Sequence, residues 1–190
     1  MIIKKAVKIL KQGGIVIFPT DTAYGIGCRI DDKKAVERLF KIRKKPKTQA
    51  VPVLVSSIEM AENYLLAFGN KIRDLMKKHW PGGLTIIYSC QTKKIPLLVR
   101  GGGENLGVRV PDHQIPLLLI KELGMPMIGT SANFHGEKTA YCFEDLNQEL
   151  IKKVDYVIKG ECQKGKASTV IDCSKKPWKV LRQGLVKIAT

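Results

Sequence analysis

The stretch from residue 13 to residue 55 constrains the fold of this chain most, because polar and cationic segments lie in it between two apolar runs. Residues 15–18 are β-branched or aromatic and stop at Pro19, which predicts a strand buried on both faces. After Asp31 and Asp32, apolar residues at helical spacing predict a helix, and residues 51–55 predict a second buried strand. This order is typical of an α/β layer structure.

The rest of the chain continues the alternation of helices and strands, so we expect a single α/β domain over residues 1–190. A chain of 190 residues is long enough for one substantial core and short for two. Residues 93–104 are basic and glycine-containing and predict a loop. The further predicted helices cover residues 2–12, 57–66, 70–79, 115–123 and 143–151, and the predicted strands cover residues 14–18, 51–55, 84–88, 106–110, 125–129, 156–158, 168–172 and 178–181.

The chain carries a formal net charge of +16, which attracts polyanions through long-range steering and counterion release. A nucleotide or a tRNA is a natural partner, although general lysine usage is the commoner cause of such a charge. Five widely spaced cysteines without a C-x-x-C pair argue against a disulfide framework or a zinc site and indicate a reducing cytosol. Residues 115–120 form the longest apolar run and are too short to span a membrane, so we expect a cytoplasmic protein.

A polar turn rich in small residues, T-D-T-A-Y-G-I-G, follows the first strand directly. Ligands bind at the carboxyl ends of strands in open α/β sheets, and Thr22 offers a hydroxyl that can donate and accept. Gly25 and Gly27 allow the backbone to approach a ligand closely. The alternative is a polar turn whose glycines serve only the backbone, and an isolated match favours that alternative.

The helix predicted after Asp32 ends in a cluster of cations. Such a cluster can clamp an anion such as phosphate. Cations at the carboxyl end of a helix also complement its dipole, so part of the cluster can be a solvated helix end. The cluster consists of Lys41, Arg43, Lys44, Lys45 and Lys47.

Together these segments resemble the YrdC/TsaC family of threonylcarbamoyl-adenylate synthases. The resemblance rests on P-T-D-T-A-Y-G, R-K-K-P, W-P-G-G-L-T, N-L-G-V-R-V-P, T-S-A-N, S-T-V-I-D and V-L-R-Q-G, which extend over nearly the whole chain. It implies the short, single-domain form of the family, with a twisted mixed sheet flanked by helices around a large basic cavity.

The chain departs from the family pattern at three places. The family carries K-x-R-P where this chain has Arg43, Lys45 and a proline, so that the two cation types are exchanged. Because Arg binds oxyanions as a planar fork and Lys as a point charge, the exchange alters the expected contacts. Gly83 and Gln183 stand where the family has proline.

The resemblance also implies which residues meet the amino acid. Threonine would contact Thr22, Arg109 and Thr169, with Arg109 clamping the carboxylate, and Ser168 would lie in the same pocket. Considered without the family, Arg109 is equally consistent with a structural ion pair, since an Arg in an apolar strand needs an anionic partner. Trp80 is expected to be a packing residue.

Catalysis and nucleotide binding are implied to share two cations. Arg43 and Lys45 are the implied catalytic residues, placed at the phosphate charge. We expect no metal site in the protein itself, and His113 is expected to be structural. The residues implied to bind the nucleotide are Arg43, Lys45, Gln49, Asn105, Ser131, Asn133, Thr139 and Arg182.

The implied reaction converts L-threonine, bicarbonate or carbon dioxide, and ATP into L-threonylcarbamoyl-AMP and pyrophosphate. Mg²⁺ would accompany ATP on its triphosphate, and a separate transferase would use the product to modify adenosine 37 of tRNA. Such chemistry can rest mainly on positioning and charge stabilisation. This agrees with three scattered histidines that show no general-base arrangement.

Two alternative functions stay open on the sequence alone. One is a basic module that binds tRNA or double-stranded RNA without catalysis, which the net charge favours. The other is a related carbamoyl-adenylate step in hydrogenase maturation, which normally belongs to a much longer chain. A phosphate-binding loop is rejected, because Gly160, Gly165 and Lys166 are followed by Ala167 and a strand-like run instead of Ser or Thr and a helix.

Overall fold

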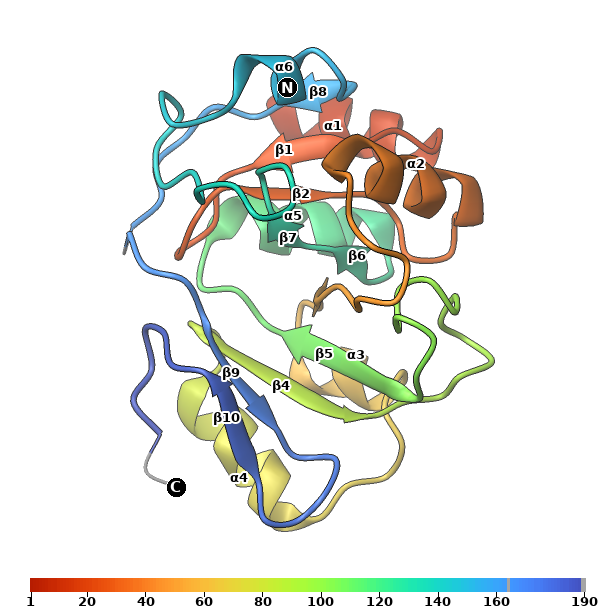
Figure 1. Ribbon diagram of the computed structural model, residues 1–190, viewed down its shortest axis with the longest axis vertical. Coiled ribbons are helices and arrows are strands. Elements are labelled where there is room, and N and C mark those ends of the chain that lie inside the picture. Colours follow the sequence, from red (N-terminus) through yellow and green to blue (C-terminus); the bar gives the residue numbers. More distant parts are fainter. Residues whose placement is uncertain (164, 189–190) are drawn as a thin grey trace.

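The computed structural model describes residues 1–163 and 165–188 and contains two β-sheets with helices around them (Figure 1). The helices are α1 (Ile2–Lys11), α2 (Lys33–Arg43), α3 (Ile58–Glu62), α4 (Asn70–His79), α5 (Gln114–Leu123) and α6 (Gln148–Ile151). The strands are β1 (Val16–Phe18), β2 (Gly25–Gly27), β3 (Val53–Leu54), β4 (Leu84–Ser89), β5 (Asn105–Arg109), β6 (Met127–Ile128), β7 (Thr130–Ser131), β8 (Tyr156–Val157), β9 (Thr169–Asp172) and β10 (Lys179–Arg182).

Both sheets are mixed, which confirms the predicted α/β class. The smaller sheet has the order β7-β2-β1-β8 and the larger sheet the order β10-β9-β4-β5-β3-β6. In the smaller sheet β1 pairs antiparallel with β2 and parallel with β8. In the larger sheet β4 pairs antiparallel with β5 and parallel with β9. The family resemblance therefore predicted the mixed arrangement, but not its division into two sheets.

The two sheets approach one another closely where β2 passes β6. The Ile128 N–H donates to the Cys28 carbonyl oxygen at 2.9 Å. A Cβ at Gly27 would overlap the Ile128 carbonyl oxygen, so only glycine fits at this crossing. Since β6 and β7 belong to different sheets and are separated by Gly129 alone, the chain changes sheet at this residue.

Local caps explain where α2 begins and ends and where α5 begins. Asp32 caps α2 by accepting a hydrogen bond from the Ala35 N–H at 3.0 Å, as its position predicted. The helix closes with Lys44 in the left-handed region at φ 52°, which turns the cationic loop back. His113 Nδ1 accepts from the Ile115 N–H and caps α5, which confirms its structural role.

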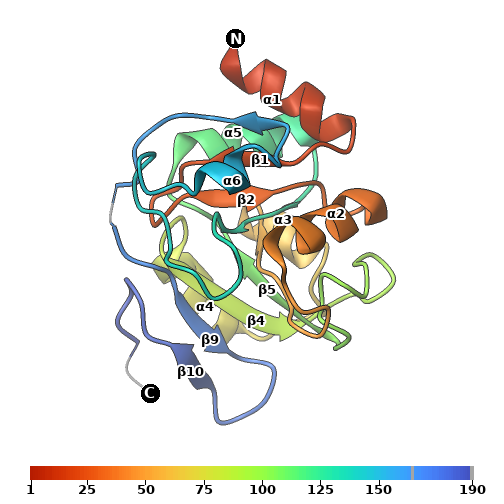
Figure 2. The same cartoon turned by 45° about the horizontal axis from the view of Figure 1, so that its top comes forward.

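The helices cover the sheets at opposite ends of the molecule. In both views α1 lies against α5 at the end far from β10, and α4 lies beside β9 and β10 (Figure 2). Buried residues of α1 and α5, such as Leu10 and Leu119, pack with Phe18 in a second hydrophobic cluster beside the main core. Within the described residues, no helix has the length and apolar character needed to cross a membrane. The assignment of one domain to residues 1–190 stays a prediction.

Some predicted elements are wrong in extent, each for a local reason. The helix predicted over residues 143–151 forms only as α6, because the Asp145 carboxylate accepts from the Tyr141 and Cys142 N–H groups and holds a turn. The helix predicted over residues 57–66 stops at Glu62, since Leu66 donates its N–H to the Ser89 carbonyl oxygen. The helix over residues 70–79 is confirmed with the predicted bounds.

Candidate functional site

A cleft of about 610 Å³ opens between the two sheets, and residues from both sheets line it. The alternation of β4 sets its floor: Thr85 and Ile87 line the cleft, whereas Leu84 and Ile86 are fully buried in the core. The polar turn after β1 and the loops before β3 and after β7 form its walls. The segments on which the sequence resemblance rests thus meet around one cleft.

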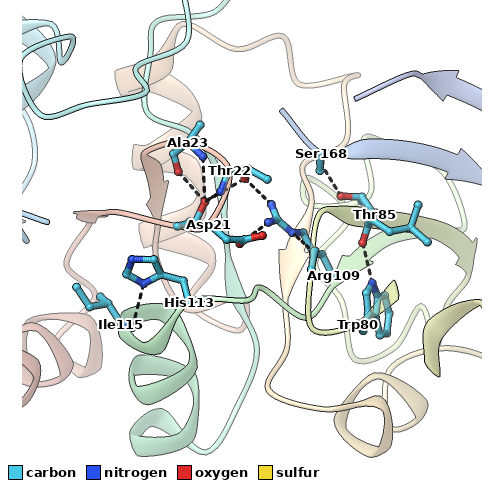
Figure 3. A network of polar contacts seen from close by, with 12 residues as sticks. Asp21, Thr22, Ala23, Trp80, Thr85, Arg109, His113, Ile115 and Ser168 are labelled. Carbon is cyan, nitrogen blue, oxygen red and sulfur yellow. Dashed lines mark hydrogen bonds and ion pairs between the residues drawn. The ribbon is translucent and has the colours of Figure 1, made fainter. Parts of the chain in front are cut away.

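Arg109 lines this cleft and is held on a platform of two turns that are far apart in sequence, one with Asp21 and Thr22 (Figure 3) and one with Gly82. Its Nε donates to the Gly82 carbonyl oxygen at 2.8 Å, its Nη1 to Thr22 Oγ1 at 2.8 Å and its Nη2 to Asp21 Oδ1 at 2.5 Å. Thr22 is itself in hydrogen-bond contact with Thr20 at 3.0 Å. Burial lowers the pKa of Arg109, and Asp21 opposes this shift. The ion pair that the sequence left open is therefore formed.

Arg43 fixes the loop that follows β7 to the end of α2. Its Nε donates to the Asn133 carbonyl oxygen at 3.0 Å, its Nη1 to Thr130 Oγ1 at 2.9 Å and its Nη2 to Asn133 Oδ1 at 2.9 Å. Ser131 Oγ donates to the same Asn133 oxygen at 2.8 Å. The Arg43 carbonyl oxygen accepts from the His135 N–H. The guanidinium thus shapes the S-A-N element, while its charge has no carboxylate partner among these contacts.

Arg43 and Lys45 are neighbouring cations of the cleft wall, and the part of the cleft around them is called the Arg43 end. Burial lowers the pKa of Arg43 to about 10. Burial, and then the neighbouring charge of Arg43, lowers the pKa of Lys45. Lys45 Nζ donates to Gln49 Oε1 at 3.1 Å, a neutral group that leaves the ammonium charge uncompensated. This end of the cleft therefore favours an anion.

A β-bulge in β10 places Arg182 in the cleft. Val180 pairs with Ile171, but Arg182 pairs with Val170, so Leu181 is the extra residue and is 58% exposed. Strict alternation from Val180 would put Arg182 on the core side of the sheet instead. Arg182 donates from Nε to the Ser168 carbonyl oxygen and from Nη2 to its hydroxyl, both at 3.0 Å.

The cleft is lined by more cations than anions. Arg43, Lys45, Arg100, Arg109 and Arg182 line it, and Glu104 is the acidic residue among the described residues that line it. Arg100 donates to the carbonyl oxygens of its own loop, at residues 95 and 103. The predicted basic cavity is therefore present.

Comparison with known proteins agrees with this geometry. The family model of the Sua5/YciO/YrdC domain, described as telomere recombination, matches residues 8–184. The chain belongs to the Sua5/YciO/YrdC family. It is 34% identical over 186 residues to the uncharacterised protein YciO of Escherichia coli K12, covering 97% of this chain and 89% of YciO.

Members of the Sua5/YciO/YrdC family with a named activity are also similar to this chain. Threonylcarbamoyl-AMP synthase of Bacillus subtilis 168 is 31% identical over 183 residues, which are 96% of this chain and 53% of the synthase. The crystal structure of Pyrococcus abyssi Sua5 complexed with L-threonine matches with a TM-score of 0.91 at 31% identity, over 96% of this chain and 54% of Sua5. The chain spans about half the length of these two relatives.

Most predicted site residues of this Sua5/YciO/YrdC chain come together at the cleft. Ser168 also lines it, as its sequence position implied. Thr85, Arg100 and Glu104 line the cleft as well but were missed. Thr85 closes the W-P-G-G-L-T segment, for which no site role was inferred, and the loop of Arg100 and Glu104 carries no motif that marks them. The predicted residues that line the cleft are Thr22, Arg43, Lys45, Asn105, Arg109, Ser131, Asn133, Thr139 and Arg182.

Two predicted site residues are not in the cleft wall. Thr169 is fully buried and points to the opposite side of β9 from Ser168, as strand geometry requires. Its hydroxyl donates to the Val186 carbonyl oxygen at 2.5 Å and accepts from the Gly184 N–H at 2.9 Å. The structure therefore corrects the contact predicted between Thr169 and threonine. Gln49 does not line the cleft, but its side-chain oxygen accepts a hydrogen bond from Lys45, which does.

The cleft wall offers one carboxylate that could contribute to binding a metal ion. Among residues 1–163 and 165–188, no three His, Cys, Asp or Glu side chains gather where they could hold a metal ion. Mg²⁺ typically keeps several waters and is bound by substrate phosphates with one or two carboxylates. Glu104, exposed at the cleft, is the residue that fits this requirement.

Proposed function

We propose that this chain is an L-threonylcarbamoyladenylate synthase. It would convert L-threonine, bicarbonate or carbon dioxide, and ATP into L-threonylcarbamoyl-AMP and pyrophosphate. The observation that carries the proposal is one cleft with two differently built ends: Arg43 and Lys45 without an acid partner, and Arg109 on its platform. The similarity to a synthase and to Sua5 supports the same reaction.

The triphosphate belongs at the Arg43 end of the cleft in this proposal. Lys45 supplies a point charge that can contact phosphate oxygens, because only the Gln49 amide oxygen accepts its hydrogen bond in the described structure. Arg43 contributes charge from behind while it holds Ser131 and Asn133 in place. Ser131, Asn133, Thr139, Asn105 and Arg182 would position the rest of the nucleotide.

Threonine belongs at the Arg109 end. A guanidinium has five N–H donors, and three of those of Arg109 bind Gly82, Thr22 and Asp21. Each terminal nitrogen keeps a second N–H for the substrate carboxylate. The Sua5 relative was crystallised with L-threonine, which supports this choice of amino acid. Preference for threonine over valine would need a polar partner for its hydroxyl, since an unpaired polar site penalises the apolar isostere.

The chemistry would proceed mainly by positioning. The threonine amine and bicarbonate form a carbamate with loss of water, and a carbamate oxygen then attacks the α-phosphorus while pyrophosphate leaves. Lys45 and the Arg43 charge would stabilise the negative charge on the phosphate oxygens. Mg²⁺ bound to the triphosphate would neutralise part of the same charge, with Glu104 as the protein carboxylate in reach of the cleft.

The product is identified most directly with labelled bicarbonate. We expect ATP, L-threonine and ¹³C-bicarbonate to give an adenylate whose mass includes the labelled carbon. Carbamoyl phosphate in place of bicarbonate and threonine tests the hydrogenase-maturation alternative. An adenylate formed only from carbamoyl phosphate would contradict the proposal. In the proposed function, L-threonylcarbamoyl-AMP would serve a separate tRNA-modifying transferase that acts on adenosine 37 in the cytoplasm.

A second candidate function is an RNA-binding module without catalysis, which the net charge of +16 favours. Salt-dependent binding of tRNA by a folded protein that forms no adenylate would establish this alternative. Binding of tRNA together with threonine-dependent adenylate formation would instead make RNA a partner of the synthase.

A further inference from the structure

The two ends of the cleft differ in how their charges are balanced. At one end Asp21 Oδ1 lies 2.5 Å from Arg109 Nη2, and both side chains are buried, at 0% and 7% exposure. Further charges around Arg109 also cancel, because Arg182 disfavours its protonated form while Asp112 favours it. Counting Arg109 itself, two acids, Asp21 and Asp112, are matched by two bases, Arg109 and Arg182.

The other end has no such balance. The lowered pKa of Arg43 has burial as its cause, and the lowered pKa of Lys45 has burial and the charge of Arg43. No acidic residue contributes to the lowered pKa of either cation. Among the described residues, the side chains of the two cations donate hydrogen bonds to neutral groups of the 130–133 segment and to Gln49. The positive charges of Arg43 and Lys45 are therefore left for a ligand.

Asp21 has a feature that its contact with Arg109 alone does not explain. Its Oδ2 is buried and has no hydrogen-bond partner among the described residues. A neutral asparagine could accept the same hydrogen bond from Arg109 without keeping a fully charged carboxylate in the interior, which is costly. What the carboxylate adds beyond an amide is its charge, which acts on whatever lies at Arg109.

We propose that Asp21 is a specificity-determining residue that keeps phosphate groups out of the amino-acid end of the cleft. The inference rests on the proposed function, which places threonine at Arg109. A polyphosphate gains most at the uncompensated Arg43 and Lys45 and is repelled by Asp21 at Arg109. Zwitterionic threonine has no net charge, so a balanced site accepts it. Without Asp21, Arg109 would be a further cleft cation without an acid partner and would bind phosphate in the place of threonine.

Calorimetric titration with inorganic pyrophosphate, without nucleotide, tests this sorting. The wild type should bind one pyrophosphate, and threonine should bind independently of it. Asp21→Asn should bind a second pyrophosphate that threonine displaces. Removing a charge this close to an anion should tighten that second site on the order of tenfold or more. Asp31→Asn is the matched control, because Asp31 also pairs with an arginine, Arg29, at 2.6 Å, but is not part of the cleft wall.

The outcomes separate this inference from the proposed function. If wild-type protein binds threonine and turns it over but pyrophosphate displaces the threonine, the role of Asp21 is refuted while the synthase assignment stands. A single pyrophosphate site in folded Asp21→Asn, with no competition by threonine, also refutes it. If Asp21→Asn does not fold, the wild-type titration decides alone. A wild type that binds no threonine refutes both.

Discussion

Arg43→Lys tests whether the guanidinium fork, and not only its charge, builds the phosphate end of the cleft. Three different nitrogens of Arg43 donate hydrogen bonds of 2.9 to 3.0 Å to Asn133 and Thr130. A lysine offers its donors from a single nitrogen and cannot reproduce the fork. We expect two of the three bonds to be lost, at about 1.5 kcal/mol each, because water at the cleft can replace part of each bond.

The expected loss in the free energy of unfolding is therefore about 3 kcal/mol, which lowers the melting temperature of a chain of this size by about 6–12 °C. Thermal unfolding followed by circular dichroism measures it. Arg38→Lys is the matched control, since Arg38 lies on the same helix but forms a solvent-exposed pair with Asp155. We expect that control to cost less than about 1 kcal/mol. A melting temperature for Arg43→Lys within about 2 °C of the wild type would refute the anchoring role.

Three further predictions follow from the structure. Gly27→Ala should lower the free energy of unfolding by about 3 kcal/mol or more in urea titrations, because its Cβ would overlap the Ile128 carbonyl oxygen. Gly107→Ala is the control, since Gly107 also lies in a strand but its Cβ would meet only ordinary contacts. This control should change the free energy of unfolding by no more than about 1 kcal/mol. The KM for ATP should rise with pH as Lys45 loses its proton below the pH usual for lysine, and Lys45→Arg should move that rise to higher pH because arginine stays charged. An unchanged pH profile in Lys45→Arg would show that Lys45 does not bind phosphate. Thr169→Val should leave the KM for threonine unchanged but lower the free energy of unfolding by about 2–4 kcal/mol, since the N–H groups of Gly184 and Val186 lose their acceptor. A selective rise in the KM for threonine would instead place Thr169 at the threonine site.

Much of the site could be predicted because its residues follow the ends of strands or the end of a helix. Thr22 comes after β1 and Arg43 ends α2, while Ser131 ends β7, and the chain brings all three to one cleft. The order of these motifs along the sequence carried that information. The same order could not show that Asn133 and Thr130 accept three hydrogen bonds from Arg43, because these contacts join residues about 90 positions apart.

The direction of individual side chains was beyond the sequence. Ser168 and Thr169 are adjacent in one motif, but strand geometry sends one to the cleft and the other to the interior. Arg182 reaches the cleft only through the bulge at Leu181, and bulges leave no pattern in a short run such as V-L-R. The acid partner of Arg109 could be expected in kind, but only the fold identifies it as Asp21.

The division into two sheets was also hidden in the sequence. β3, β6 and β7 have two ladder residues each, too few for an alternation pattern to define them. Gly27 was expected to let the backbone approach a ligand, but the group close to it is the Ile128 carbonyl oxygen, a tertiary contact that the sequence does not reveal. Hydrophobic pattern therefore predicted which segments are buried, and packing decided which sheet each one joins.

Pyrophosphate release by the purified protein tests the central claim most directly. The assay contains ATP, Mg²⁺ and bicarbonate, and compares L-threonine with L-valine and with no amino acid. A synthase releases pyrophosphate at a rate that depends on threonine and is much lower with valine. A folded protein that releases pyrophosphate equally with threonine, with valine and without amino acid, or not at all, would contradict the account.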